Sequence, residues 1–260
     1  MIFIINSAIA SLYKEPTKNC GRVDEVLYGM HVTAIKNEGD YVYIRTGYRY
    51  EGWINKKHLL KPLDSHKVSL IKYVSNTTTD VLTLPKVQAN LLITLTLGCT
   101  VNVMKEESDG WVKVFLADGT KGYMRSAHLS LFPKNCTEEV MRKNICKTAT
   151  NYLDVQYRWG GKSPQGIDCS GLCFMAYYLN GINIYRDADI KEGFAIKKIP
   201  QHEAKKGDLA FFPGHVGMLL DENNLIHSSE GGNGVKIEPF TKVIAQRGEP
   251  TKFGASSFFL

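Results

Sequence analysis

The sequence predicts an α+β fold in which two small all-β units precede one unit that mixes helices with strands. The chain has 260 residues, roughly twice the size of one ordinary domain, so two or three folding units are expected. A strand-turn-strand pattern occurs twice, and its copies lie about 70 residues apart. After Pro133 the apolar residues recur at helical rather than strand spacing. The predicted units are residues 1–66, 67–136 and 137–260.

The composition is that of a globular protein. Hydrophobic residues make up 43% of the chain and charged residues 22%, values typical of a folded chain rather than a disordered one. The net charge of +6 is spread over all three predicted units, so no basic stripe suggests a nucleic-acid partner. The apolar stretch at 91–103 is short and interrupted by threonines, so no membrane insertion is expected.

The six cysteines show no disulfide-scaffold or metal-ligand spacing, and no metal or cofactor is expected. Unpaired thiols favour a reducing cytoplasm. Residues 2–12 are expected to form a first strand, because a secretory signal has a basic start and a longer apolar core. A secreted or periplasmic protein that has lost its leader is the alternative. Five cysteines are expected to be structural: Cys20, Cys99, Cys136, Cys146 and Cys173.

Each copy of the repeat consists of an alternating strand, a turn rich in glycine or aspartate, a short strand and a helical turn. The first copy includes 39–45, 52–54 and 58–59, and the second includes 109–114, 122–124 and 128–129. These segments resemble bacterial SH3-like domains, which are small β-barrels. Trp53 and Trp111 are accordingly expected in the barrel cores.

The third unit is predicted to begin with a helix. Thr137 can cap it, and Glu138 and Glu139 in its first turn favour the positive end of the helix dipole. The predicted apolar face consists of Val140, Met141, Ile145, Ala149 and Leu153.

The segment 157–168 is a glycine-rich loop that leads into a second predicted helix, 170–180, with Gly181 as its left-handed cap. Cys169 therefore lies at a helix amino terminus. Unpaired N–H groups and the helix dipole there are expected to lower the pKa of the thiol below its free value of about 8.5. The same N–H groups can stabilise an oxyanion. Cys169 is the candidate nucleophile.

Two histidines are candidates for the base that a thiol nucleophile needs. His215 and His227 lie on two predicted strands joined by a turn at 221–223, so the imidazoles are expected to be cross-strand neighbours. His227 can then fix the tautomer of His215.

Five runs, 157–161, 168–172, 207–209, 215–217 and 226–227, resemble in order and spacing the NlpC-type family of cell-wall cysteine peptidases. The resemblance covers nearly all of residues 137–260. It implies a papain-like α+β core preceded by the two SH3-like barrels. It also implies Cys169 as nucleophile, His215 as general base, His227 as the orienting third residue, and Tyr157 near the oxyanion and substrate backbone.

The order of the three units resembles the subgroup that cleaves muropeptides between γ-D-glutamate and a diamino acid and that requires a free amino-terminal L-alanine. This resemblance implies that Asp168 and Ser170 contact the substrate's amine and backbone, and that Glu15 and Tyr50 of the first barrel contribute to the same pocket. A carboxylate facing the amine would discriminate against a blocked peptide. The chain departs from the family pattern at Ala188, where a hydroxyl residue is common, and at Glu51, an additional acid.

Several alternatives remain at this stage. Asp168 can act solely as a helix cap. The same thioester chemistry can serve acyl or amide transfer, and the substrate can be an intact wall stem peptide instead of a released muropeptide. A wall-binding module without catalysis is the alternative from another functional class. The sequence does not distinguish diaminopimelate from lysine in the substrate.

Overall fold

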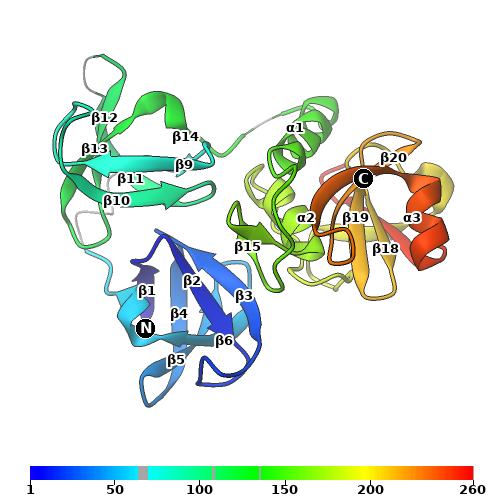
Figure 1. The fold of residues 1–260 in the computed structure, drawn as a ribbon, viewed down its shortest axis with the longest axis horizontal. Coiled ribbons are helices and arrows are strands. Elements are labelled where there is room, and N and C mark those ends of the chain that lie inside the picture. The colour runs from blue at the N-terminus through cyan, green and yellow to red at the C-terminus, as the bar shows by residue number, and fades with distance from the viewer. Residues whose placement is uncertain (64–69, 107–108, 135, 260) are drawn as a thin grey trace. The chain divides into compact units, whose positions relative to one another are not determined.

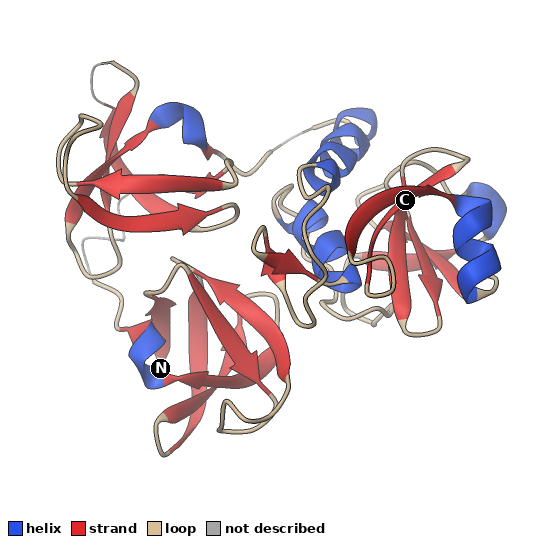
Figure 2. Cartoon of the chain, viewed as in Figure 1, coloured by secondary structure: helices blue, strands red, loops and turns tan. Residues whose placement is uncertain are grey.

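The computed structural model describes residues 1–63, 70–106, 109–134 and 136–259. The chain divides into two compact units, Met1–Phe132 and Pro133–Leu260, which are treated separately below. The first is built almost wholly of strands, and the second combines helices with a sheet (Figure 2). The α+β class is therefore confirmed. The predicted boundary between residues 66 and 67 lies outside the described residues, and none of the described helices is long and apolar enough to cross a membrane.

The first unit contains two seven-stranded antiparallel sheets (Figure 1). The strand orders are β3-β2-β6-β5-β4-β1-β7 and β10-β9-β13-β12-β11-β8-β14, so the sequence repeat corresponds to a repeated topology. The first sheet comprises β1 (Ile2–Ile5), β2 (Ile9–Tyr13), β3 (Arg22–Leu27), β4 (His31–Glu38), β5 (Tyr41–Thr46), β6 (Glu51–Asn55) and β7 (Leu59–Leu60). The second comprises β8 (Leu70–Val74), β9 (Thr78–Leu82), β10 (Leu91–Thr96), β11 (Thr100–Glu106), β12 (Trp111–Phe115), β13 (Lys121–Arg125) and β14 (Leu129–Ser130).

Trp53 and Trp111 are both buried, as the repeat predicts for barrel cores. The expectation of one strand over residues 2–12 is wrong, because β1 and β2 are separate strands with different partners. The chain turns between them, where Ser7 Oγ lies 2.7 Å from His58 Nδ1 and Asn6 N–H donates to the His58 carbonyl. No glycine or proline marks this turn in the sequence.

The second unit begins with α1 (Glu138–Thr150), whose N-cap is Thr137; its hydroxyl accepts from the N–H of Val140 at 3.4 Å. The predicted helix and cap are confirmed. Met141, Ile145 and Ala149 are buried, but Val140 is 46% exposed and Leu153, beyond the helix end, is 39% exposed. The buried face is therefore narrower than predicted.

A six-stranded antiparallel sheet and two further helices complete this unit. The strand order is β17-β22-β18-β19-β20-β21. Its strands are β17 (Ile196–Ile199), β18 (Leu209–Phe212), β19 (His215–Leu219), β20 (Asn224–Ser229), β21 (Gly234–Pro239) and β22 (Lys252–Ser256), beside a small hairpin of β15 (Lys162–Ser163) and β16 (Gly166–Ile167). The helix α2 (Cys169–Tyr178) packs against α1, β19 and β20. Its residues are buried on every side through Tyr177, as expected for a helix that is apolar all round.

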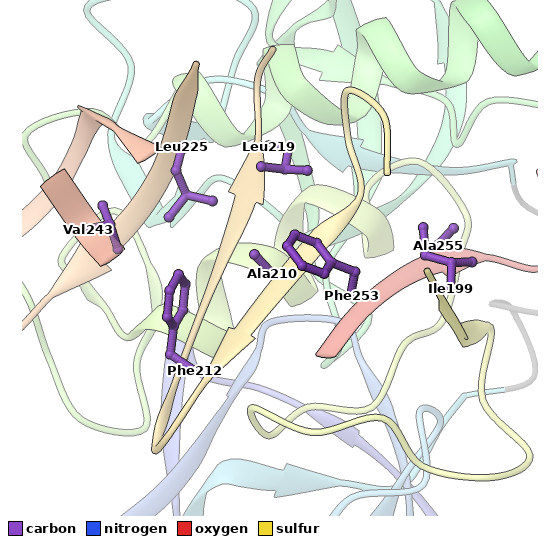
Figure 3. Packing of buried hydrophobic residues seen from close by; sticks show 8 residues of the cluster. All are labelled: Ile199, Ala210, Phe212, Leu219, Leu225, Val243, Phe253 and Ala255. Atoms are coloured by element: carbon purple, nitrogen blue, oxygen red, sulfur yellow. The ribbon is translucent and has the colours of Figure 1, made fainter. Parts of the chain in front are cut away.

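The hydrophobic core of the sheet fixes the strands that carry the candidate histidines. Eight buried residues from five strands and the helix α3 (Phe240–Arg247) pack together (Figure 3). Phe212, which pairs with His215 across the β18–β19 hairpin, belongs to this cluster, and so does Leu225, two residues before His227. The cluster comprises Ile199, Ala210, Phe212, Leu219, Leu225, Val243, Phe253 and Ala255.

Candidate active site

The helix α2 begins at Cys169, so the candidate nucleophile is the first helical residue. Asp168 is the N-cap, and its Oδ1 accepts from the N–H of Gly171 at 2.6 Å. A Cβ at position 171 would lie 2.2 Å from the Gly161 carbonyl oxygen, so glycine is required for the loop to approach the helix. The Asp-Cys-Ser-Gly run thus combines a helix cap, the candidate nucleophile and a close backbone contact. The predicted cap Gly181 has φ +80°.

Arg186 is a buried residue that sequence analysis did not single out. Its Nη1 donates to Asp168 Oδ1 at 3.0 Å and to Ser170 Oγ at 2.9 Å. Its Nη2 donates to Asp168 Oδ2 at 3.2 Å and to the Gly161 carbonyl at 3.1 Å. The guanidinium therefore ties the glycine loop to both residues that flank Cys169. No local pattern reveals this partnership, because Arg186 lies 18 residues from Asp168 along the chain.

The side chains of Asp168 and Ser170 both have hydrogen-bond partners around Arg186. Asp168 also accepts from the N–H of Gly160 at 2.7 Å and from the Ser170 hydroxyl at 3.2 Å. The predicted helix-cap role of Asp168 is observed. Its contact with a substrate amine stays a prediction, as does the substrate contact of Ser170.

Cys169 is buried, with 7% of the residue exposed. Burial raises its pKa, and the charge of Asp168 raises it further. Hydrogen bonds from the backbone N–H groups of Val216 and Ser170 lower it, but by less. The expected depression of this pKa below the ordinary value is therefore wrong: burial outweighs the helix amino terminus. The bond from Val216 also places the sulfur beside the start of β19.

His215, His227 and Glu238 form a hydrogen-bonded chain. His215 Nε2 lies 2.8 Å from His227 Nδ1, and His227 Nε2 lies 2.9 Å from Glu238 Oε2. All three residues are buried. The two histidines are brought together by the predicted hairpin, in which Met218 pairs with Ile226. A Cβ at Gly217 would lie 2.5 Å from Leu225 Cδ2 and 3.2 Å from the Cβ of His227, so glycine lets β19 pack closely against β20.

Glu238 determines the protonation of this chain. Hydrogen bonds from Lys242 and His227 keep the pKa of Glu238 below its usual value, against the effect of burial, so the carboxylate is ionised. An ionised carboxylate only accepts, so His227 carries its proton on Nε2 and accepts at Nδ1. His215 then donates from Nε2, which leaves its Nδ1 as a free lone pair.

Sequence analysis did not identify Glu238. It lies on β21 opposite Leu225, diagonally across from His227, whose direct partner is Lys236. In the sequence the alternation of charged and apolar residues over 234–239 indicates only a half-exposed strand. The role of Glu238 follows from strand register, which the sequence leaves open.

Burial lowers the pKa of His215 to about 3, and the charges of Arg247 and His227 act in the same direction. His215 is therefore neutral at pH 7, and Cys169 rests as a thiol. A neutral imidazole with a free lone pair is a general base, ready to accept the thiol proton when the sulfur attacks an electrophile.

Tyr157 is half-buried near the nucleophile. It forms an isolated parallel bridge with Ile167, two residues before Cys169. Burial raises its pKa, and the neighbouring carboxylate of Asp168 raises it further. The phenol consequently keeps its proton and can donate a hydrogen bond.

Glu15 and Tyr50 belong to the first compact unit. Glu15 is exposed in the loop after β2, and Tyr50 is half-buried, with its hydroxyl 3.5 Å from the Val23 carbonyl. Glu51 pairs with Arg45 at 2.6 Å, which gives this additional acid a local partner. Ala188 lies half-buried after Arg186.

Within the described parts of the chain, no three His, Cys, Asp or Glu side chains are grouped as metal ligands.

Comparison with protein families identifies two matches. Residues 154–248 match the NlpC/P60 family, and residues 12–59 match the bacterial dipeptidyl-peptidase Sh3 domain. Dipeptidyl-peptidase 6 of Lysinibacillus sphaericus is 43% identical over 243 residues, which cover 90% of each chain. Gamma-D-glutamyl-L-lysine dipeptidyl-peptidase of Bacillus subtilis is 28% identical over 86% of this chain and 77% of its own length.

A solved structure of similar fold is an NlpC/P60 family protein from Bacillus cereus, with a TM-score of 0.83 and 20% identity. It covers 97% of this chain, and this chain covers 98% of it. The fold and the sequence relationship thus extend beyond the carboxy-terminal unit to the β-rich region.

Proposed function

Because this chain belongs to the NlpC/P60 family of peptidoglycan-hydrolysing cysteine peptidases, we propose that it cleaves the γ-D-glutamyl–diamino acid bond of peptidoglycan-derived peptides. The observation that carries the proposal is the hydrogen-bonded array of His215, His227 and Glu238, which lies in the same unit as Cys169 at the start of α2. The choice of bond is supported by the relatives named gamma-D-glutamyl-L-lysine dipeptidyl-peptidases. Small released muropeptides are the proposed form of the substrate.

The proposed reaction has two steps. The sulfur of Cys169 attacks the γ-glutamyl carbonyl while His215 Nδ1 accepts the thiol proton, and His215 then gives that proton to the leaving amine. The thioester is hydrolysed when His215 takes a proton from water, the resulting hydroxide adds to the carbonyl, and the sulfur leaves with the proton. The backbone N–H of Cys169 at the start of α2 and the Tyr157 hydroxyl stabilise the oxyanion in both steps.

The variant Glu238→Gln tests the role of the carboxylate. We expect kcat to fall about 10-fold with little change in KM, since the amide cannot fix the His227 tautomer in the same way. Burial lowers the pKa of His227 and the hydrogen bond to Glu238 partly offsets this, so the loss of Glu238 should lower that pKa further. Steady-state kinetics at pH 7 measure kcat and KM, and an NMR pH titration of the histidine rings measures the pKa. An unchanged kcat would contradict the assignment.

We propose that the Glu15 carboxylate and Tyr50 of the first unit recognise the free amine of the substrate's L-alanine. We also propose Asp168 and Ser170 of the second unit as substrate-binding residues. Glu15 suits this role because the described residues give its carboxylate no ion pair. A cationic amine would supply the partner.

Comparing L-Ala-γ-D-Glu-L-Lys with its amino-acetylated form tests this recognition. We expect kcat/KM for the acetylated peptide to be about 100-fold lower, because acetylation removes the charge that the carboxylate meets. Glu15→Gln should lower the rate on the free peptide and leave that on the acetylated peptide nearly unchanged. Equal rates of the native enzyme on both peptides would refute the amine contact.

A further inference from the structure

Within the first unit, the second barrel (β8–β14) is hydrogen-bonded to the base of one hairpin of the first barrel (β1–β7), the hairpin of β2 and β3. The Tyr28 carbonyl, just after β3, accepts from the N–H of Thr100 at 2.8 Å and from its hydroxyl at 3.4 Å. The Tyr28 hydroxyl accepts from the N–H of Ala117 at 2.6 Å. Just before β2, the Ala8 carbonyl accepts from the Cys99 thiol at 3.3 Å. Both ends of this hairpin are therefore bound to the second barrel.

This contact between the barrels is closely packed. Tyr28, Cys99 and Ala117 are all buried. Gly29 has φ +80°, and a Cβ there would lie 2.2 Å from the Thr100 carbonyl oxygen. Glycine is therefore needed at this position both for the left-handed backbone and for the close approach of the second barrel. Without the Tyr28 hydroxyl, the buried N–H of Ala117 would lose its hydrogen bond.

The other end of the same hairpin carries the proposed amine-binding carboxylate. β2 pairs with β3 along its length, and Glu15 lies in the loop that connects them (Figure 1). The backbone of Glu15 is held within this loop: its N–H donates to the sulfur of Cys20 at 3.4 Å, and its carbonyl accepts from the N–H of Thr17 at 2.7 Å. The Tyr50 hydroxyl lies 3.5 Å from the carbonyl of Val23 on β3. Both proposed amine-binding residues are therefore attached to this hairpin.

A displacement at the base of the hairpin is expected to move its tip. An antiparallel strand rises about 3.4 Å per residue, so Glu15 lies roughly 20 Å from Ala8 along the hairpin. Because the two strands are hydrogen-bonded to each other, a tilt at the base is carried to the loop. Misplacing a substrate-positioning group by about 1 Å can cost about 100-fold in rate. A contact that served only to stabilise the barrels would affect all substrates alike, whereas a positioning contact would affect those that carry the free amine.

We propose that the second barrel fixes the β2–β3 hairpin through Tyr28 and Gly29, so that Glu15 and Tyr50 meet the free amine of the substrate. This inference rests on the proposed recognition of that amine. Tyr28 and Gly29 are accordingly positioning residues, which act through Glu15 and do not touch the substrate. The second barrel thereby contributes to the choice of substrate without containing a substrate-binding residue.

The test is Gly29→Ala, whose methyl group would collide with Thr100. Native and variant enzymes are assayed on L-Ala-γ-D-Glu-L-Lys and on its amino-acetylated form, or on the diaminopimelate counterparts if the native enzyme cleaves only those. We expect Gly29→Ala to lower kcat/KM on the free peptide about 10-fold, through KM, and to change that on the acetylated peptide less than about 2-fold. Tyr28→Phe, which removes only the hydroxyl bound to Ala117, should lower kcat/KM on the free peptide about 3-fold. If Gly29→Ala does not fold, the same comparisons are made with Tyr28→Phe.

Gly39→Ala is the matched control, because Gly39 also belongs to the first barrel and has φ +52°, but a Cβ there would meet nothing within 4 Å. It should keep the native preference for the free peptide. In a Glu15→Gln background, Gly29→Ala should cause no further loss, since the carboxylate that it positions is already gone.

Three results would overturn the inference and leave the proposed cleavage intact. They are equal losses on both peptides, equal effects of Gly29→Ala and Gly39→Ala, and a full additional loss in the Glu15→Gln background. Equal native rates on the two peptides would remove the amine contact and this inference with it. Failure of the native enzyme to cleave any of these peptides would overturn the proposed function as well.

Discussion

Replacing Cys169 with alanine is expected to reduce turnover of L-Ala-γ-D-Glu-L-Lys by at least about 10⁴-fold, because no thioester can form without the sulfur. Cys169→Ser should be similarly inactive, since a serine hydroxyl is a weaker nucleophile than a thiol. The rate is measured from the amount of free lysine released over time, which is quantified by chromatography.

Cys173→Ala is the matched control for this experiment. Cys173 lies one helical turn after Cys169 in the same helix, and it is buried. Cys173 is 1% exposed and lies inside the helix rather than at its amino terminus, so we expect it to take no part in catalysis. Turnover should survive in this variant. An active Cys169→Ala protein would eliminate the assignment of the nucleophile.

Replacing Arg186 with methionine is expected to lower the free energy of unfolding of the carboxy-terminal unit by about 3–5 kcal/mol. The variant leaves the Asp168 charge buried without its bidentate partner, and it releases the Gly161 carbonyl. Denaturant unfolding followed by circular dichroism measures the change. The double variant Asp168→Asn/Arg186→Met should recover part of the loss, because the orphaned charge is gone.

Lys252→Met gives the comparison for an ordinary surface pair. Lys252 pairs with the exposed Asp189 in the same unit, and its loss should cost less than about 1 kcal/mol. If Arg186→Met costs equally little, the hydrogen bonds of Arg186 to Asp168 and Gly161 do not hold the glycine-rich loop against α2.

The local features of this chain could be predicted from its sequence. Thr137 as a cap, Gly181 as a left-handed helix end and the hairpin that carries His215 and His227 all follow from short-range chemistry. The repeat predicted two β units because each copy contains its own strands and turns.

The interactions between distant residues could not be predicted. Arg186 meets Asp168, and Glu238 meets His227, only through the tertiary packing of a loop and the register of two strands. The pKa of Cys169 depends on how deeply the helix end is buried, which the motif does not reveal. The turn that divides residues 2–12 into two strands is likewise set by contacts with His58.

The most direct test of the central claim is the identity of the products formed from L-Ala-γ-D-Glu-L-Lys in water labelled with heavy oxygen. Mass spectrometry should detect free lysine and the dipeptide L-Ala-γ-D-Glu with one labelled oxygen in its γ-carboxyl group. That result requires hydrolysis of the γ-glutamyl bond. Release of alanine, or failure of the native enzyme to cleave the tripeptide with either lysine or diaminopimelate in the third position, would contradict the account.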